Sequence, residues 1–235
     1  MPRHQNILIA TAAALVSAAL IIPTSGVVAQ HRTHVTVNHT PMIEGSGHIV
    51  QQRRDVGAFH AVDTVGSEDI DIRFGPRTSV VIAADDNILP LLSSRVINGT
   101  LKLESRGSYQ TRGPIRVWIT TPKLDEFTSA GSGNVVIHDV SSSSLRLSLK
   151  GSGDIQANGR TGQLDLALMG SGRVRLGDLT ATDVSAGVFG SGDATVRATG
   201  KLDAQMFGSG VLRYVGNPKT MRSSHFGSGR IIASN

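Results

Sequence analysis

Six serines recur in the same local sequence, and their hydroxyl groups are the first candidates for chemistry in this chain. Each is the middle residue of a Gly-Ser-Gly tripeptide, and they are Ser132, Ser152, Ser171, Ser191, Ser209 and Ser228. A catalytic serine is needed once, and the nucleophile elbow that carries it reads Gly-x-Ser-x-Gly between a strand and a helix. The tighter, repeated pattern therefore predicts a ladder of outward-pointing serines at a turn, without a nucleophilic role.

Metal binding is the second candidate. Aspartate follows two of the tripeptides, as in calcium-binding β-roll repeats, which need an acidic ligand in every turn. The residues at that position are Asn134, Asp154, Arg173, Asp193, Val211 and Arg230. Two arginines and a valine interrupt any column of calcium ions. His31, His34 and His39 could collect a transition metal, but no cysteine or nearby carboxylate completes a site. We therefore expect no metal and no cofactor.

Paired carboxylates are the third candidate, because two of them can cleave a glycosidic bond. Asp139, Asp165, Asp178 and Asp203 could supply such a pair, but we place them at different offsets within their repeats and therefore expect nothing to align them. No helical segment follows the glycines, which argues against a phosphate-binding loop. The sequence thus predicts a protein that is not an enzyme. The alternative is a carbohydrate-active β-helix enzyme or a glycan-binding module.

The spacing of the tripeptides predicts the elements that position these residues. The first glycines are Gly131, Gly151, Gly170, Gly190, Gly208 and Gly227, with spacings of 20, 19, 20, 18 and 19 residues. A period of this size is typical of a repeat protein built from stacked units, each of which buries its apolar face only against its neighbours. A seventh copy, at Gly45, stands apart from the series.

Apolar and polar residues alternate on both sides of each tripeptide. Leu145, Leu147 and Leu149 precede one copy, and mostly apolar residues occupy the same even offsets around the others. This period of two indicates half-buried strands. The glycines indicate a bend where a neighbouring backbone approaches closely, and by the same alternation both should face the core. We therefore expect an all-β fold, with a right-handed parallel β-helix-like solenoid over residues 124–235. An antiparallel meander in a β-sandwich is the competing interpretation.

The region 45–123 is also strand-rich but less regular. The expected strands are 57–65, 69–74, 79–84, 101–104 and 115–120. One short helical turn is expected within 85–92, stopped near Pro90. Asn98-Gly99 lies between two apolar runs and predicts a tight hairpin turn.

The first 29 residues have the layout of a secretory signal peptide. A short basic start at Arg3 and His4 precedes an apolar stretch from 7 to 22, and Val27-Val28-Ala29 is a small-residue cleavage signal. We expect the mature chain to begin at Gln30 with a flexible leader over 30–44. It would be exported to the periplasm, the medium or the cell surface, without a stable membrane span. The alternative is a retained anchor, for which about 16 apolar residues are few.

The composition and the distribution of charge argue against disulfides and against nucleic acid as a partner. The chain has no cysteine, so an exported form must rely on its core without disulfides. Its 23 Lys and Arg and 18 Asp and Glu are scattered, and Arg53-Arg54 is the one basic doublet. Nucleic-acid grooves need clustered charge and aromatic stacking platforms. We therefore expect no nucleic-acid partner.

One outward position carries large apolar side chains. Lys150, Met169, Phe189, Phe207 and Phe226 immediately precede successive tripeptides, and stacked coils would align them with a rise of about 4.8 Å per coil. We take Met169, Phe189, Phe207 and Phe226 as a candidate contact surface. Another segment of this chain, an envelope protein, a second copy of the chain or a glycan could cover it.

Several segments together resemble the bacterial "head GIN" domain family, described as the head domain of autotransporter adhesins. They are Gly45-Ser46-Gly47, Arg53-Arg54-Asp55-Val56 with Phe59, 62–65, 70–75, Asp86-Asn87, Asn98-Gly99-Thr100-Leu101 and the run 119–124 before the tripeptides. The resemblance covers the chain from Gly45 onward. It implies an all-β, helix-like domain on exported bacterial proteins. The expected function is therefore adhesin-like binding or envelope structure, with no catalytic residues.

Overall fold

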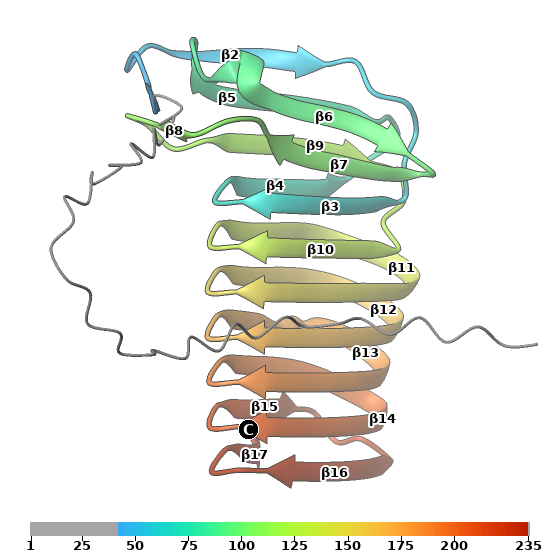
Figure 1. The fold of residues 1–235 in the computed structure, drawn as a ribbon. Coiled ribbons are helices and arrows are strands. Elements are labelled where there is room, and N and C mark those ends of the chain that lie inside the picture. Colours follow the sequence, from blue (N-terminus) through green and yellow to red (C-terminus); the bar gives the residue numbers. More distant parts are fainter. Residues whose placement is uncertain (1–41, 235) are drawn as a thin grey trace, which may run out of the picture. The chain divides into compact units, whose positions relative to one another are not determined.

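The computed structural model describes residues 42–234, which form a column of stacked coils with an antiparallel region at one end (Figure 1). The long strands are β11 (Asn134–Gly151), β12 (Asp154–Gly170), β13 (Arg173–Gly190) and β14 (Asp193–Gly208). Each pairs in parallel with the next, and the chain winds in a right-handed sense away from the antiparallel region (Figure 1). The predicted all-β solenoid is confirmed, and the antiparallel sandwich is wrong.

The strand register repeats the sequence period. Leu147 lies beside Leu166, and Leu166 lies beside Ala186 in the following coil. Inside the coils, the side chains at the even offsets form one continuous apolar core. Leu147 and Leu149 are completely buried there. Burying one such side chain contributes about 1.5–3 kcal/mol, and this contribution exists only because each coil covers the next.

The tripeptide glycines face the neighbouring coil, which corrects the expectation that both point into the core. A Cβ atom on Gly172 would overlap the carbonyl oxygen of Gly153, and one on Gly170 would overlap that of Gly151. Gly170 also has a φ of +128°, which side chains disfavour. The Ser171 and Gly172 N–H groups both donate to the Gly151 carbonyl, at 3.0 and 3.1 Å. Glycine is therefore required because successive turns approach along the column axis.

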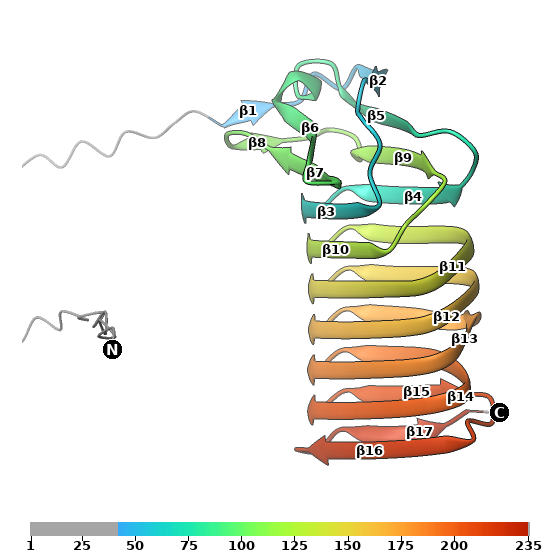
Figure 2. The same ribbon diagram turned by 90° about the vertical axis from the view of Figure 1, so that its right-hand side faces the viewer.

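The N-terminal strands form the first coil and a cap over it. The first coil consists of β3 (Ala61–Gly66) and β4 (Asp69–Phe74), which pair on one side with β10 (Glu126–Gly131) and β11. On the other side they pair with β7 (Thr100–Ser105) and β9 (Arg116–Thr121). The chain between β4 and β10 thus leaves the column, covers its end and returns (Figure 2).

The remaining elements complete the two ends of the column. The cap also contains β2 (Ile49–Arg54), β5 (Ser79–Asp85), the 3₁₀ turn η1 (Leu89–Leu91) and β6 (Leu92–Ile97). Beside it, β1 (Ile43–Glu44) pairs with β8 (Tyr109–Gln110). The far end consists of β15 (Val211–Val215), β16 (Thr220–Phe226) and β17 (Arg230–Ala233). None of the described residues forms a helix that is long and apolar enough to cross a bilayer.

The cap follows the sequence predictions in part. The hairpin at Asn98-Gly99 is confirmed, since both residues have positive φ and join the antiparallel strands β6 and β7. The expected helical turn is the short η1, which contains Pro90. Strands β2 and β8 were not expected, and β1 occupies the last two residues of the expected leader 30–44. The expected signal peptide and the rest of that leader, up to residue 41, lie outside the described residues.

Glu68 stands where the later coils have their second glycine. The register aligns Gly66 with Gly131, so Gly66-Ser67-Glu68 is the first coil's form of the tripeptide. The Glu68 side chain is 6% exposed, and its carboxylate accepts a hydrogen bond from the Thr64 hydroxyl at 3.3 Å. Burial raises the pKa of this carboxyl, although the Thr64 hydroxyl and the Glu68 N–H favour its charged form.

This buried carboxyl makes stability depend on pH. The folded chain holds the Glu68 proton more tightly than the unfolded chain, so stability falls as pH rises from the ordinary glutamate pKa through the raised one. We expect Glu68→Gln to increase the free energy of unfolding at pH 7 and to leave it unchanged at pH 4. Urea unfolding across this pH range tests the expectation, and parallel pH profiles for the two proteins would contradict it.

Candidate functional site

The candidate contact residues lie on one outer face of the column. The register places Met169 beside Phe189, Phe189 beside Phe207, and Phe207 beside Phe226. Their exposed fractions are 37%, 41%, 37% and 64% in the same order. We call these four residues the ladder. Each side chain is partly open to solvent, so the described part of the chain leaves the ladder available for contact.

The phenylalanines of the ladder stack on one another. The Phe189 and Phe207 ring centres are 5.2 Å apart with planes at 5°, and the Phe207 and Phe226 centres are 5.3 Å apart with planes at 12°. The ring faces are therefore turned toward each other, and the surface presents ring edges. A sugar stacks on an aromatic face, which the inner ring, Phe207, does not offer. The ladder consequently suits an apolar partner surface better than a glycan.

Small residues run beside the ladder. Ser148, Ala167 and Gly187 are neighbours in the register, two positions before Lys150, Met169 and Phe189. The Phe189 ring lies so close to Gly187 that a Cβ atom there would be 2.8 Å from the Phe189 Cε2 atom. The small side chains leave the sheet flat next to Met169 and Phe189, whereas Gln205 occupies the same position beside Phe207.

The repeated serines of the tripeptides form the expected outward-pointing row at the turn. They are exposed, and the Ser191 and Ser209 hydroxyl oxygens are 3.1 Å apart. The aspartates after the tripeptides are engaged by arginines: Asp154 lies 3.1 Å from Arg175, and Asp193 lies 3.9 Å from Arg213. Among residues 42–234, no three His, Cys, Asp or Glu side chains are grouped to hold a metal ion. His31, His34 and His39 lie outside the described residues.

The carboxylates of the repeats are less separated than expected. Asp165 and Asp203 occupy the same position two coils apart, with Ser185 between them. Both line a depression of about 400 Å³ together with Asp183 and Lys201, which corrects the expectation that nothing aligns them. The Asp165 carboxylate lies 3.0 Å from the Arg146 guanidinium. This ion pair engages the Asp165 carboxylate with a residue of the preceding coil.

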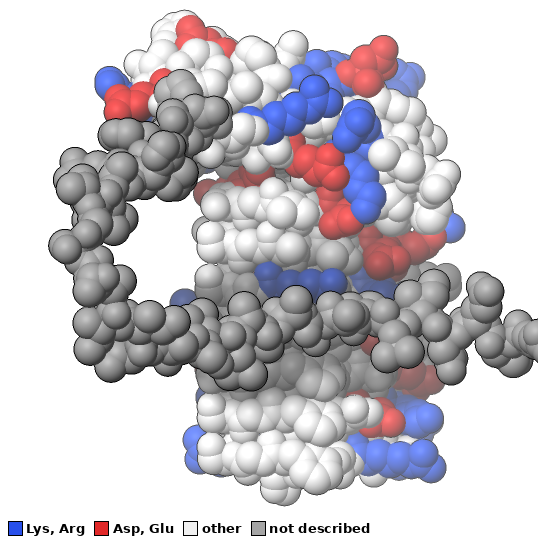
Figure 3. All heavy atoms as spheres, in the orientation of Figure 1, with Lys and Arg blue, Asp and Glu red and all other residues white. Residues whose placement is uncertain are grey.

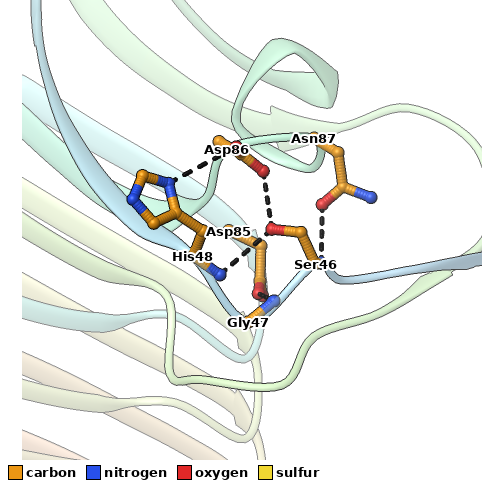
Figure 4. Close-up of polar contacts among 6 residues, drawn as sticks. All are labelled: Ser46, Gly47, His48, Asp85, Asp86 and Asn87. Atoms are coloured by element: carbon orange, nitrogen blue, oxygen red, sulfur yellow. Dashed lines mark hydrogen bonds and ion pairs between the residues drawn. The ribbon is translucent and has the colours of Figure 1, made fainter.

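The seventh tripeptide lies outside the column, in a polar cluster at the cap (Figure 4). Ser46, His48 and Asp86 meet there, which is the residue set of a catalytic triad. The Ser46 hydroxyl donates directly to Asp86 at 2.6 Å, and His48 Nδ1 lies 3.4 Å from the other Asp86 oxygen. A triad needs the histidine between serine and aspartate to remove the serine proton. Here the Ser46 hydrogen bond lowers the pKa of Asp86 instead.

The same cluster fastens the segment before β2 to the end of β5. Asp85 is fully buried, and its carboxylate accepts the N–H groups of Gly47 at 2.6 Å and Arg112 at 3.1 Å. Asn87 accepts the Ser46 N–H at 2.9 Å and donates to the Glu44 carbonyl at 2.7 Å. The cluster therefore has the contacts of a structural fastening, and the spacing of the repeats gave no signal for it.

One exposed tryptophan lies on the cap strand β9, next to strand β4 of the first coil. Trp118 is 36% exposed beside a hollow of about 270 Å³, and the polar residues that line this hollow are Asp69, Asp71, Arg116 and Asn134. Asp69 accepts the Asn134 side-chain amide at 3.0 Å, and Asp71 contacts His138 at 3.0 Å. An indole next to carboxylate, amide and guanidinium groups can bind a sugar, through ring stacking and hydrogen bonds to hydroxyls. No motif or spacing in the sequence indicated this hollow.

The comparison with protein families gives a match over most of the chain. The profile of the family described as "Putative auto-transporter adhesin, head GIN domain" matches residues 58–218. This range includes the first coil, most of the cap and the coils up to β15. No curated protein matches the chain.

Solved structures resemble the fold. A "putative adhesin" from Bacteroides fragilis is 24% identical with a TM-score of 0.68, covering 82% of this chain and 100% of that one. A "putative lipid binding protein" from Parabacteroides distasonis is 23% identical with a TM-score of 0.54, covering 83% and 100%. A "putative adhesin" from Parabacteroides merdae is 17% identical with a TM-score of 0.56, covering 83% and 99%. At these identities the likeness concerns the fold.

Proposed function

Because this chain belongs to the "Putative auto-transporter adhesin, head GIN domain" family, we propose that it is a non-catalytic, adhesin-like binding protein of the bacterial cell envelope. Export would follow from the signal peptide expected over residues 1–29. The binding surface would be the ladder of Met169, Phe189, Phe207 and Phe226.

The exposed ladder is the observation that carries this proposal. Large apolar side chains that are aligned and partly open to solvent are costly on a free surface and typical of a contact surface. Stacking of the rings holds their edges in one plane, so little side-chain freedom is lost on binding. Since the ladder presents apolar ring edges and has small neighbours at Met169 and Phe189, the partner we propose is another protein surface, either an envelope protein or a second copy of this chain.

The double variant Phe189→Ser, Phe207→Ser tests the ladder. We expect self-association, or capture of an envelope partner, to weaken at least tenfold, because the centre of an interface contributes most of its affinity. Loss of the ring stacking should cost about 1–2 kcal/mol of stability, which denaturant melts would measure. Ile97→Ser is the matched control, since Ile97 is 47% exposed on the cap hairpin. Unchanged association in the double variant would contradict the proposal.

Glycan binding at the Trp118 hollow is the second candidate function. The exposed indole beside Asp69, Asp71, Arg116 and Asn134 favours it, and the hollow is large enough for one sugar ring. In the same set of experiments, Trp118→Ala should abolish binding to immobilised oligosaccharides while the ladder variant retains it. If the ladder variant loses protein association and the unaltered chain binds no oligosaccharide, only the first proposed function is supported.

A further inference from the structure

A hollow of about 400 Å³ lies at the cap, between the end of β2 and the segment that includes η1 and the start of β6. It is far in sequence from the ladder and does not include Trp118. The charged and hydroxyl residues that line it are Arg53, Arg54, Asp55, Ser93, Ser94 and Arg106. Figure 3 shows Lys and Arg side chains gathered over the cap beside acidic ones. The basic doublet of the sequence, Arg53-Arg54, is part of this hollow.

Arg54 is held in the hollow with an unused hydrogen-bond donor. Its Nη2 atom donates to the Leu89 carbonyl at 2.9 Å, which fixes the guanidinium against η1. Its Nε atom is buried and has no hydrogen-bond partner among the described residues. Burial also lowers the pKa of the Arg54 guanidinium. Such a buried, unpaired donor costs free energy unless a ligand or water completes its hydrogen bonding.

The arginines of the hollow also lack acidic partners. Within residues 42–234, none of Arg53, Arg54 and Arg106 forms an ion pair. Arg95, which lies on the same strand as Ser93 and Ser94, pairs with Glu104 at 3.1 Å. The chain therefore pairs an arginine just outside the hollow with a carboxylate, whereas the three arginines that line the hollow form no ion pair within the described residues.

We propose that this hollow binds a phosphate group. Its three arginines and one aspartate leave two positive charges, which match the charge of about −1.5 to −2 on a phosphate monoester. Arginine forks donate paired hydrogen bonds to phosphate oxygens, and because Ser93 and Ser94 alternate across strand β6, one of their hydroxyls can add a donor. A carboxylate has two oxygens and one charge, so it would leave part of this donor set unused. The phosphate is either on a soluble phosphate ester or in a lipid headgroup.

Titration of the full chain with glycerol phosphate, followed by calorimetry in a buffer of low ionic strength, tests the proposal. We expect saturable binding that weakens at least tenfold in Arg54→Gln. Arg95→Gln is the matched control and should bind within twofold of the unaltered chain, because Arg95 does not line the hollow. Arg106→Gln provides a second variant at an exposed position, where a severalfold loss is expected without an effect on folding.

Flotation with vesicles separates the two sources of phosphate. Phosphatidylcholine vesicles with and without phosphatidic acid serve as probes for the same four proteins. Binding to phosphatidic acid vesicles alone assigns the site to a lipid headgroup, and binding of glycerol phosphate assigns it to a soluble ester. Each outcome supports the site only if Arg54→Gln or Arg106→Gln weakens it more than Arg95→Gln. Equal binding by all variants, or no binding of either probe, would overturn the proposal.

Discussion

Gly172→Val is expected to lower the free energy of unfolding by about 2–4 kcal/mol. The new Cβ atom would overlap the Gly153 carbonyl oxygen of the preceding coil and would lie 2.8 Å from the Leu149 Cδ2 atom. Backbone atoms of the neighbouring coil cannot move aside without lengthening the hydrogen bonds between coils. The strain should therefore spread to both neighbours of the altered coil. Denaturant unfolding followed by circular dichroism measures the loss.

Ser171→Ala is the matched control for this prediction. Ser171 is adjacent in sequence and exposed, so the change should alter stability by less than about 1 kcal/mol. If the two variants lost the same free energy, the close approach of the coils at this turn would not be the reason for the glycine.

Asp85→Ala is expected to destabilise the chain by about 2–4 kcal/mol. The fully buried carboxylate accepts the N–H groups of Gly47 and Arg112, and its removal would leave both donors unsatisfied. Hydrogen bonds to a charged group contribute about 1.5–3 kcal/mol each. The segment before β2 should detach first, which would appear as faster amide hydrogen exchange at Gly47.

Asp86→Ala separates the buried anchor from the surface contacts of the same cluster. Asp86 accepts the Ser46 hydroxyl but is exposed, so solvent can replace its partners and the loss of stability should be much smaller than that of Asp85→Ala. Destabilisation by Asp86→Ala that equals that of Asp85→Ala would show that the burial of Asp85 is not decisive.

The column could be predicted from the sequence because its copies share one environment. Once Gly151 and Gly170 are aligned, the same register fixes the inward leucines, the outward serines and the ladder. Strand β4 has the predicted bounds for the same reason, since its alternating pattern is that of the repeats. Each additional copy of the period therefore added independent support to the same fold.

The cap could not be predicted to the same extent because each of its contacts occurs once. Strand β2 pairs with β5 although β3 and β4 lie between them in the sequence. No periodic pattern in the sequence predicts that pairing. Gly66-Ser67-Glu68 is a further copy of the tripeptide that is not recognisable in the sequence, because Glu68 replaces the second glycine. A side chain fits there because no earlier turn of the column lies against the first coil. The unpaired arginines of the cap hollow also depend on this non-repeated packing, which sequence spacing does not encode.

The direction of the hydrogen bonds between coils has a mechanical consequence. Strands run across the column, so the bonds that join one coil to the next lie along its axis, and the described termini are near its opposite ends (Figure 1). A pull between those ends loads these bonds in tension. The strands at the far end, β16 and β17, each pair with a strand of the preceding coil. These two strands would detach first, and Phe226 would leave the ladder with β16. The domain would then lengthen coil by coil and absorb work at each step, while the rings above the break remain in place.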